Sequence, residues 1–201
     1  MIDVLWKGGV LMIPILLCSV IALGIIIEKM ITLRQNRVIP YETLRKVEVL
    51  LRERDLSGAA SLCKKNPSVM TRVLYTALIH KDKDRSELKE IIEDAGRHEV
   101  PVLERYTSLL GTIASISPLL GLLGTVTGMI KVFNIISFEG VGHPQALSGG
   151  ISEALITTAA GLAVAIPTLV FYNYFMTKGE SLVVELEKNS LRMLGLLKRE
   201  E

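Results

Sequence analysis

The sequence predicts an all-α membrane protein with three transmembrane helices and long helical extensions on the cytoplasmic side. Three observations lead to this fold class. Of the 201 residues, 49% are hydrophobic and 22% are charged, yet the charges are gathered into blocks along the chain. Aromatic residues make up only 5%, so the apolar mass is mainly aliphatic, which suits helices in lipid better than a β-rich core. The third observation is that three long runs contain no charged residue.

These uncharged runs comprise residues 8–27, 109–130 and 154–177. A helix needs about 20 apolar residues to cross the hydrocarbon core, and backbone groups in lipid must be satisfied within the segment, as they are in a helix. Each run therefore predicts a transmembrane helix. The first run could instead be a cleaved signal peptide, but it exceeds the usual apolar region of about 7–15 residues and lacks a clear small-x-small cleavage site.

The placement of Lys and Arg predicts the orientation of the chain. Residues 28–106 carry 16 Lys and Arg against 13 Asp and Glu, whereas the connection 137–148 carries neither Lys nor Arg. Cytoplasmic segments are enriched in positive charge, so we expect the N-terminus and this connection outside. Lys131, at the outer end of the second run, is expected to extend its ammonium group to the membrane interface.

The runs and the orientation together divide the chain into six segments. We expect the first transmembrane helix within residues 1–29, a cytoplasmic helical segment over 30–106, the second transmembrane helix over 107–136, a periplasmic loop over 137–148, the third transmembrane helix over 149–177 and a cytoplasmic C-terminal helix over 178–201. An apolar stripe in the last segment predicts that the third helix continues past Lys178.

Capping residues and prolines indicate how the cytoplasmic segment is organised. Asp55 predicts the start of a short helix, and Asp84 followed by Glu87 resembles a capping box that opens a later one. No stop signal follows before the second uncharged run. We therefore expect one long helix that passes from the cytoplasm into the membrane, kinked at Pro101 and Pro118.

Small side chains line one face of each of the later two runs. At about 100° per residue, one face of the second run presents Ala114, Ser117, Pro118, Gly121, Gly124, Thr125 and Gly128. The corresponding face of the third run presents Ala154, Thr158, Gly161 and Ala165. Small residues let helix backbones approach closely in lipid, so we expect the glycines of both stripes to pack helices together.

A carboxyl group, that of Glu153, lies at the outer start of the third run. A carboxyl inside the bilayer costs about 2.5–3.5 kcal/mol, which makes it a functional candidate by default. With the hydroxyls of Thr125 and Thr158 it describes a narrow polar seam that could relay or bind a proton. The alternative is that these threonines and Thr157 bond to backbone carbonyls of the preceding turn, and that Glu153 is hydrated at the interface.

Other classes of function find little support in the sequence. The glycines of the second run do not form a phosphate loop, because no Gly-Lys-Ser/Thr follows them, and His98-Glu99 lacks the second histidine of a metalloprotease helix. The net charge of +2 is too small to favour nucleic acid as a partner. We therefore expect no catalytic residue, no metal site and no cofactor.

Two segments resemble the signature membrane segments of the MotA/TolQ/ExbB proton channel family: residues 117–130 (SPLLGLLGTVTGMI) and residues 150–167 (GISEALITTAAGLAVAIP). The resemblance is specific over residues 105–175. A single N-terminal span followed by a helical cytoplasmic insert agrees with the ExbB and TolQ branch. The flagellar MotA branch is less similar, since its members usually have four spans and a longer chain.

The resemblance implies a homopentamer whose second and third helices line a central pore. The pore would enclose the single membrane helix of an ExbD-, TolR- or MotB-type partner, which carries an essential aspartate. Proton passage past that aspartate would drive rotation, and a periplasmic TonB- or TolA-type protein would receive the motion. The resemblance also implies that Thr125 and Thr158 face the pore, that Glu153 is the pore glutamate, and that Pro167 is structural.

The resemblance further implies a multi-pass protein of the bacterial inner membrane, not an enzyme, that drives processes such as TonB-dependent uptake. Its N-terminus would be periplasmic and its C-terminus cytoplasmic. A non-conducting membrane scaffold and a flagellar or gliding-type stator are the alternatives, while a secondary transporter is disfavoured because the chain has no inverted repeat. The choice between ExbB and TolQ, the partner's identity, and the coupling ion, proton or sodium, stay open.

Overall fold

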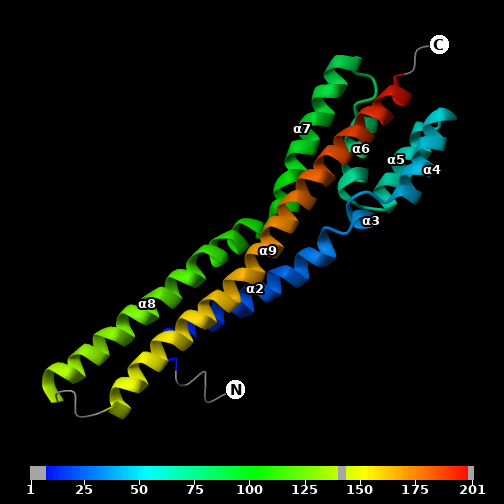
Figure 1. The fold of residues 1–201 in the computed structure, drawn as a ribbon. Coiled ribbons are helices and arrows are strands. Elements are labelled where there is room, and N and C mark those ends of the chain that lie inside the picture. The colour runs from blue at the N-terminus through cyan, green and yellow to red at the C-terminus, as the bar shows by residue number, and fades with distance from the viewer. Residues whose placement is uncertain (1–7, 140–143, 199–201) are drawn as a thin grey trace. The chain divides into compact units, whose positions relative to one another are not determined.

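The computed structural model describes residues 8–139 and 144–198, and over these residues it contains helices and no strands (Figure 1). The helices in chain order are α2 (Met12–Thr32), α3 (Gln35–Val38), α4 (Tyr41–Arg52), α5 (Leu56–Lys65), α6 (Val69–Ile79), α7 (Arg85–Glu104), α8 (Thr107–Glu139) and α9 (Pro144–Leu197). The chain divides into two compact units. Unit 1 comprises residues 1–27 and 106–174, and unit 2 comprises residues 28–105 and 175–201.

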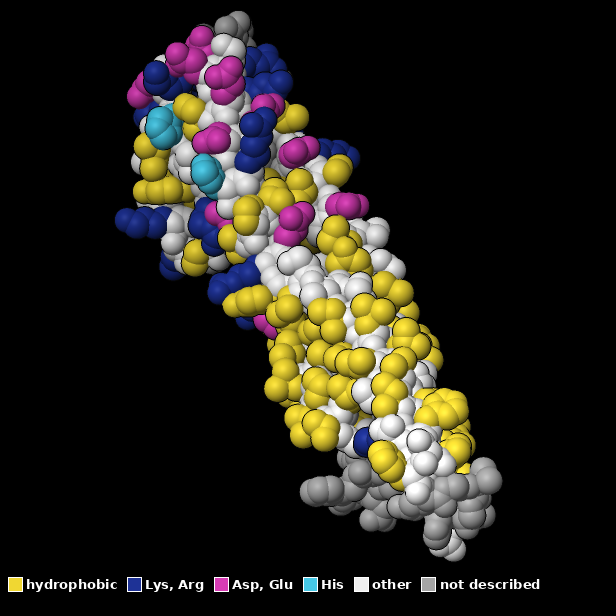
Figure 2. All heavy atoms as spheres, turned by 90° about the vertical axis from the view of Figure 1, so that its left-hand side faces the viewer, with side chains coloured by type: hydrophobic (Ala, Val, Ile, Leu, Met, Phe, Trp, Pro, Cys, Tyr) yellow, Lys and Arg dark blue, Asp and Glu magenta, His cyan; other side chains and the backbone are white. Residues whose placement is uncertain are grey.

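Unit 1 is apolar outside as well as inside. Leu119, Ile166 and Val170 are each 62% exposed, and a helix that is apolar all round belongs in a core or in lipid. Three stretches of the described chain are long and apolar enough to cross a membrane: Met12–Thr32, Arg85–Phe138 and Leu147–Leu197. On the face shown in Figure 2, most charged side chains lie in the upper part of the view, and hydrophobic side chains dominate the part below them.

Unit 2 is a bundle of short amphipathic helices and the last part of α9. Leu182, Leu186 and Leu194 of α9 are buried in it, so the helix expected past Lys178 is present and extends to Leu197. Cys63 of α5 lies in the same core, where burial raises the pKa of its thiol to about 11. The thiol is therefore protonated at neutral pH and packs as a small apolar group.

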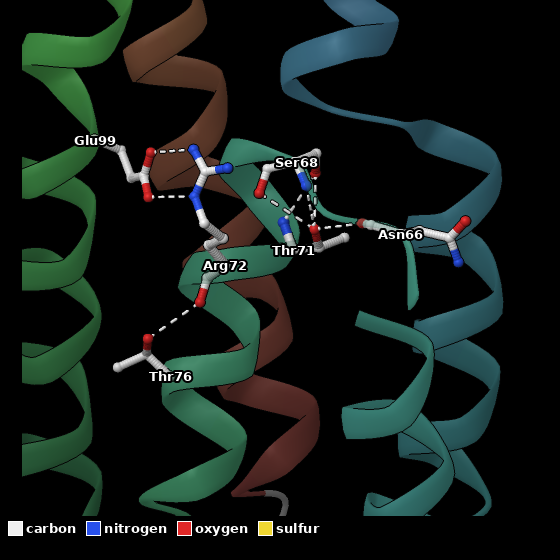
Figure 3. Close-up of polar contacts among 6 residues, drawn as sticks. All are labelled: Asn66, Ser68, Thr71, Arg72, Thr76 and Glu99. Atoms are coloured by element: carbon white, nitrogen blue, oxygen red, sulfur yellow. Dashed lines mark hydrogen bonds and ion pairs between the residues drawn. The ribbon is translucent and has the colours of Figure 1, made fainter. Parts of the chain in front are cut away.

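Side-chain caps begin three of the helices in unit 2. Asp55 accepts a hydrogen bond from the backbone of Gly58, and Asp84 accepts one from the backbone of Glu87. The reciprocal capping box, however, lies at the start of α6 (Figure 3). There the Ser68 hydroxyl accepts from the Thr71 backbone at 3.1 Å, and the Thr71 hydroxyl accepts from the Ser68 backbone at 2.7 Å.

An ion pair links α6 to α7 beside this cap (Figure 3). The guanidinium of Arg72 donates to both carboxylate oxygens of Glu99, with the Nε–Oε1 distance at 2.6 Å. This fork geometry constrains both side chains. It links the first turn of α6 to the later turns of α7.

The expected single helix from the cytoplasm into the membrane is wrong. α7 ends at Glu104 and α8 begins at Thr107. Between them Arg105 has a non-helical ψ of 132°, and Tyr106 has φ of 64°, a left-handed conformation that is uncommon outside glycine. Such a residue cannot continue a right-handed helix. Pro101 lies within α7 and Pro118 within α8, so neither proline ends a helix.

The connection expected over residues 137–148 is shorter at both ends. α8 continues to Glu139, and α9 already begins at Pro144. Proline is well suited to a first helical position, because its missing N–H is one that the helix would leave unpaired. The remaining residues of the expected loop, 140–143, and the expected outer N-terminal residues 1–7 lie outside the described chain.

Candidate functional site

Helices α8 and α9 lie side by side in unit 1 (Figure 1) and meet through their small residues. A Cβ atom built on Gly124 would lie 2.5 Å from Cγ2 of Thr157, and one built on Gly128 would lie 2.8 Å from Cβ of Ala154. Real Cβ atoms do not approach other atoms so closely. The two glycines therefore set how near α9 can come to α8.

The same contact continues one turn further along both helices. A Cβ atom on Gly121 would lie 3.0 Å from Cα of Thr158, and one on Gly161 would lie 2.6 Å from the backbone oxygen of Ser117. The contact is thus backbone against backbone. The structure brings together all four glycines expected to pack helices, and we call this contact, residues 117–128 with residues 154–161, the small-residue seam.

Thr158 crosses the seam with its side chain. Its hydroxyl donates to the backbone oxygen of Gly121 in α8 at 2.9 Å, so it does not bond to the preceding turn of its own helix. A hydroxyl that donates its proton still has lone pairs to accept another hydrogen bond. Thr158 is half-buried, which leaves this oxygen within reach of a further group.

Thr125 lies on α8 but does not cross the seam. Its hydroxyl donates to the backbone oxygen of Leu122 at 2.6 Å, within its own helix, which is the alternative that the sequence left open. The side chain is half-buried. The structure of the single chain therefore joins Thr158 to the opposite helix and Thr125 to its own.

Thr157 is the residue that sequence reasoning undervalued. It is fully buried, and its hydroxyl lies 2.6 Å from the backbone oxygen of Glu153 and 2.8 Å from that of Gly8. It thus fastens the beginning of the described chain to α9. The signal was available in the pair Thr157-Thr158, because consecutive hydroxyls on a helix point about 100° apart and can serve two neighbours.

Glu153 lies one turn before Thr157 and forms an ion pair. Its Oε1 atom is 2.6 Å from Nζ of Lys131 in α8, and 22% of the Glu153 side chain is exposed. Gly9 lies against the same carboxylate: a Cβ atom built on Gly9 would collide with Oε1 of Glu153, and Gly9 has φ of 70°. Lys131 was expected to extend to the interface, and here its ammonium group reaches the carboxylate.

The arrangement offers proton chemistry and little else. A carboxylate can bind a proton, and the hydroxyl oxygen of Thr158 can accept a hydrogen bond. Across residues 8–139 and 144–198, no group of three or more His, Cys, Asp or Glu side chains is placed to hold a metal ion. Around the seam, the described groups are hydroxyls, backbone carbonyls and the Lys131–Glu153 ion pair.

Comparison with known proteins gives consistent matches. The model of the MotA/TolQ/ExbB proton channel family matches residues 65–188, which include the whole seam. The chain is 37% identical over 175 residues to a protein named ExbB-like 3 from Synechocystis, covering 84% of this chain and 81% of that protein.

Shorter matches reach proteins of both branches. The chain is 43% identical over 79 residues to the Tol-Pal system protein TolQ of Haemophilus influenzae, covering 39% of this chain and 35% of TolQ. It is 38% identical over 85 residues to the biopolymer transport protein ExbB of Aquifex aeolicus, covering 42% of this chain and 57% of ExbB. Similarity of this kind does not separate the two branches.

Proposed function

Because the chain belongs to the MotA/TolQ/ExbB proton channel family, we propose that it is the channel and stator subunit of a motor driven by the proton-motive force. The motor is of the ExbB-ExbD-TonB or TolQ-TolR-TolA type, lies in the bacterial inner membrane and transmits energy to the periplasm and outer membrane, for example for TonB-dependent uptake. The names ExbB and TolQ among the similar proteins support these two types.

The observation that carries this proposal is the small-residue seam with Glu153 at its outer end. Among the described side chains of unit 1, Glu153 is the only carboxylate. A proton that crosses a membrane releases about 2.3 kcal/mol per 100 mV, and it needs groups to carry it over the whole distance. One acid at one end cannot do this, which supports a partner that contributes a second titrating group, the aspartate of an ExbD- or TolR-type helix.

The exterior of unit 1 supports assembly in lipid. Large side chains such as Leu122 (58% exposed) and Leu155 (63% exposed) are uncovered in the single chain, and so much apolar surface needs lipid or other helices against it. In the proposed homopentamer, α8 and α9 of five copies surround the partner helix. The N-terminus is periplasmic and the C-terminus cytoplasmic.

Each candidate residue has a role in this assembly. Glu153 takes the proton at the outer mouth. The Thr158 oxygen, with its proton donated to Gly121, accepts a hydrogen bond from the protonated acid of the partner. Thr125 is the second hydroxyl along the pore, and the glycines of the seam hold α8 and α9 at the distance that these contacts need.

Proton uptake into liposomes tests the proposal. The purified complex of this chain with its candidate single-span partner is reconstituted, a potential is imposed, and wild type is compared with Glu153→Gln and Thr158→Val. We expect uptake that requires the partner and is lost in both variants. Thr127→Val is the matched control, because it removes a threonine hydroxyl that donates only within its own helix, to Leu123 at 3.0 Å and to Gly124 at 3.1 Å, and that has no proposed role on the path.

Two results would contradict the proposal in different ways. Unchanged uptake in Glu153→Gln and Thr158→Val would remove these residues from the proton path. No uptake by the assembled wild-type complex would favour a non-conducting scaffold, in which the seam only packs helices.

A further inference from the structure

Two charged side chains of unit 1 are described, and they pair with each other. Among residues 8–27, 106–138 and 145–174, Lys131 and Glu153 are the only Asp, Glu, Lys or Arg residues. They stand on different helices, and Nζ of Lys131 lies 2.6 Å from Oε1 of Glu153. Because no other charged side chain of unit 1 is described, the ammonium of Lys131 is the cation that neutralises this carboxylate in the structure.

The backbone closes the carboxylate from another side. Gly9 lies so near to Oε1 of Glu153 that any side chain there would collide with it. The same oxygen therefore has Lys131 and Gly9 as close neighbours. Lys131 itself is 55% exposed in the single chain, so its aliphatic part does not support the fold as a core side chain would.

A proton and a sodium ion would use this carboxylate differently. Sodium is a hard cation, and such ions bind through several oxygen atoms gathered around them. The ammonium of Lys131 already pairs with one of the oxygens, and its positive charge repels a second cation at the same carboxylate. A proton needs only one oxygen, because it forms a covalent O–H bond and turns the carboxylate into a neutral acid.

We propose that Lys131 is a specificity-determining residue. Its ammonium occupies the position beside Glu153 that a metal cation would need, so that a proton, and not a sodium ion, binds this carboxylate. The inference rests on the proposed function of Glu153 as the outer proton site. When a proton from the outer aqueous side binds Glu153, the ion pair opens and Lys131 keeps its charge. When the proton leaves toward the partner, the carboxylate and the pair form again.

Sodium binding to the purified chain in detergent tests this inference without any transport. Wild type, Lys131→Met and Lys131→Arg are compared for bound radioactive sodium at neutral pH. Methionine keeps the length of the side chain and removes its charge, whereas arginine keeps the charge. Removal of a unit charge at this distance changes the affinity for a second cation by about tenfold or more, so Lys131→Met should bind sodium with a dissociation constant about tenfold lower than that of wild type or Lys131→Arg.

The double variant Lys131→Met with Glu153→Gln shows where the sodium binds. Its bound sodium should return to the wild-type level, because the carboxylate is gone. The inference is overturned if Lys131→Met binds no more sodium than wild type, or if wild type itself binds sodium that Glu153→Gln removes.

Transport gives the second readout. In the reconstituted complex, replacement of external choline by sodium should slow proton uptake in Lys131→Met and leave wild type and Lys131→Arg unchanged. If wild type takes up no protons, the proposed function fails, but sodium binding in detergent still decides the role of Lys131. The two failures are therefore distinguishable.

Discussion

At the scale of single residues, the most enclosed charge in the described chain is that of Lys29. Its side chain is fully buried in unit 2, and its ammonium donates to the backbone oxygen of Leu103 at 2.8 Å. Leu103 lies in the last turn of α7, where backbone oxygens have no partner within the helix. A cation also interacts favourably with the C-terminal end of a helix dipole. Lys29 thus completes the end of α7 just before the chain turns at Tyr106.

We expect Lys29→Met to destabilise the protein. The variant leaves the buried oxygen of Leu103 without a donor, which costs about 1–3 kcal/mol, and the melting temperature in detergent should fall clearly. Lys89→Met is the matched control, because Lys89 is 55% exposed and pairs with the exposed Glu93, and such surface pairs contribute about 0–1 kcal/mol. Equal melting temperatures for the two variants would contradict this account of Lys29.

At the scale of elements, the sequence predicted caps and periodicities better than interruptions. Asp55 and Asp84 predict helix starts because their side chains accept hydrogen bonds from the first backbone N–H groups of the helix that follows. The break at Arg105 and Tyr106 could not be predicted, since neither residue is the Gly or Asn that usually ends a helix in a left-handed conformation. Local sequence carries the signal for a cap, but this break depends on its tertiary surroundings.

The candidate site likewise combines features that the sequence predicts with features that it does not. The stripe of Gly121, Gly124 and Gly128 is visible in the sequence because it repeats with the helix period. The pairing of Lys131 with Glu153 is not, because it depends on how α8 is placed along α9, a property of two helices together. The contact of Thr157 with Gly8 joins residues 149 positions apart, and no periodicity reports it.

Two glycines of α9 and α8 should respond in opposite ways to replacement by alanine. In Gly124→Ala the new Cβ atom would lie 2.5 Å from Thr157, and such overpacking costs about 1–3 kcal/mol. Gly179 has no atom within 4 Å of the new Cβ, so Gly179→Ala should gain up to about 1 kcal/mol from helix propensity alone. Thermal unfolding in detergent measures both. A stabilised Gly124→Ala would mean that the seam is looser than its geometry indicates.

At the scale of the whole molecule, charge is divided between the two units. Unit 2 carries nearly all the described Lys, Arg, Asp and Glu residues, whereas unit 1 presents apolar side chains outward. A segment rich in charge favours water and one rich in apolar side chains favours lipid, and an excess of Lys and Arg favours the cytoplasmic side for the charged segment. The proposed orientation follows from this distribution.

Labelling of substituted cysteines tests the orientation. In a chain whose two native cysteines are replaced by serine, Ser148→Cys should react with a membrane-impermeant maleimide added to spheroplasts, and Asp82→Cys should react only after the membrane is opened. Both side chains are exposed in the structure, so burial would not explain a difference. The reverse pattern of labelling would invert the proposed topology.

The contact between Thr157 and Gly8 has a consequence for biosynthesis. A ribosome adds about 5–20 residues per second, and the two residues are 149 positions apart. Thr157, whose hydroxyl donates to the backbone oxygen of Gly8, is therefore translated about 7–30 s after Gly8. During this interval the backbone oxygen of Gly8 lacks the hydrogen bond from Thr157, and a chain that stops after the second helix never forms it. The last helix to be translated thus supplies the hydrogen-bond donor for the first residue of the described chain.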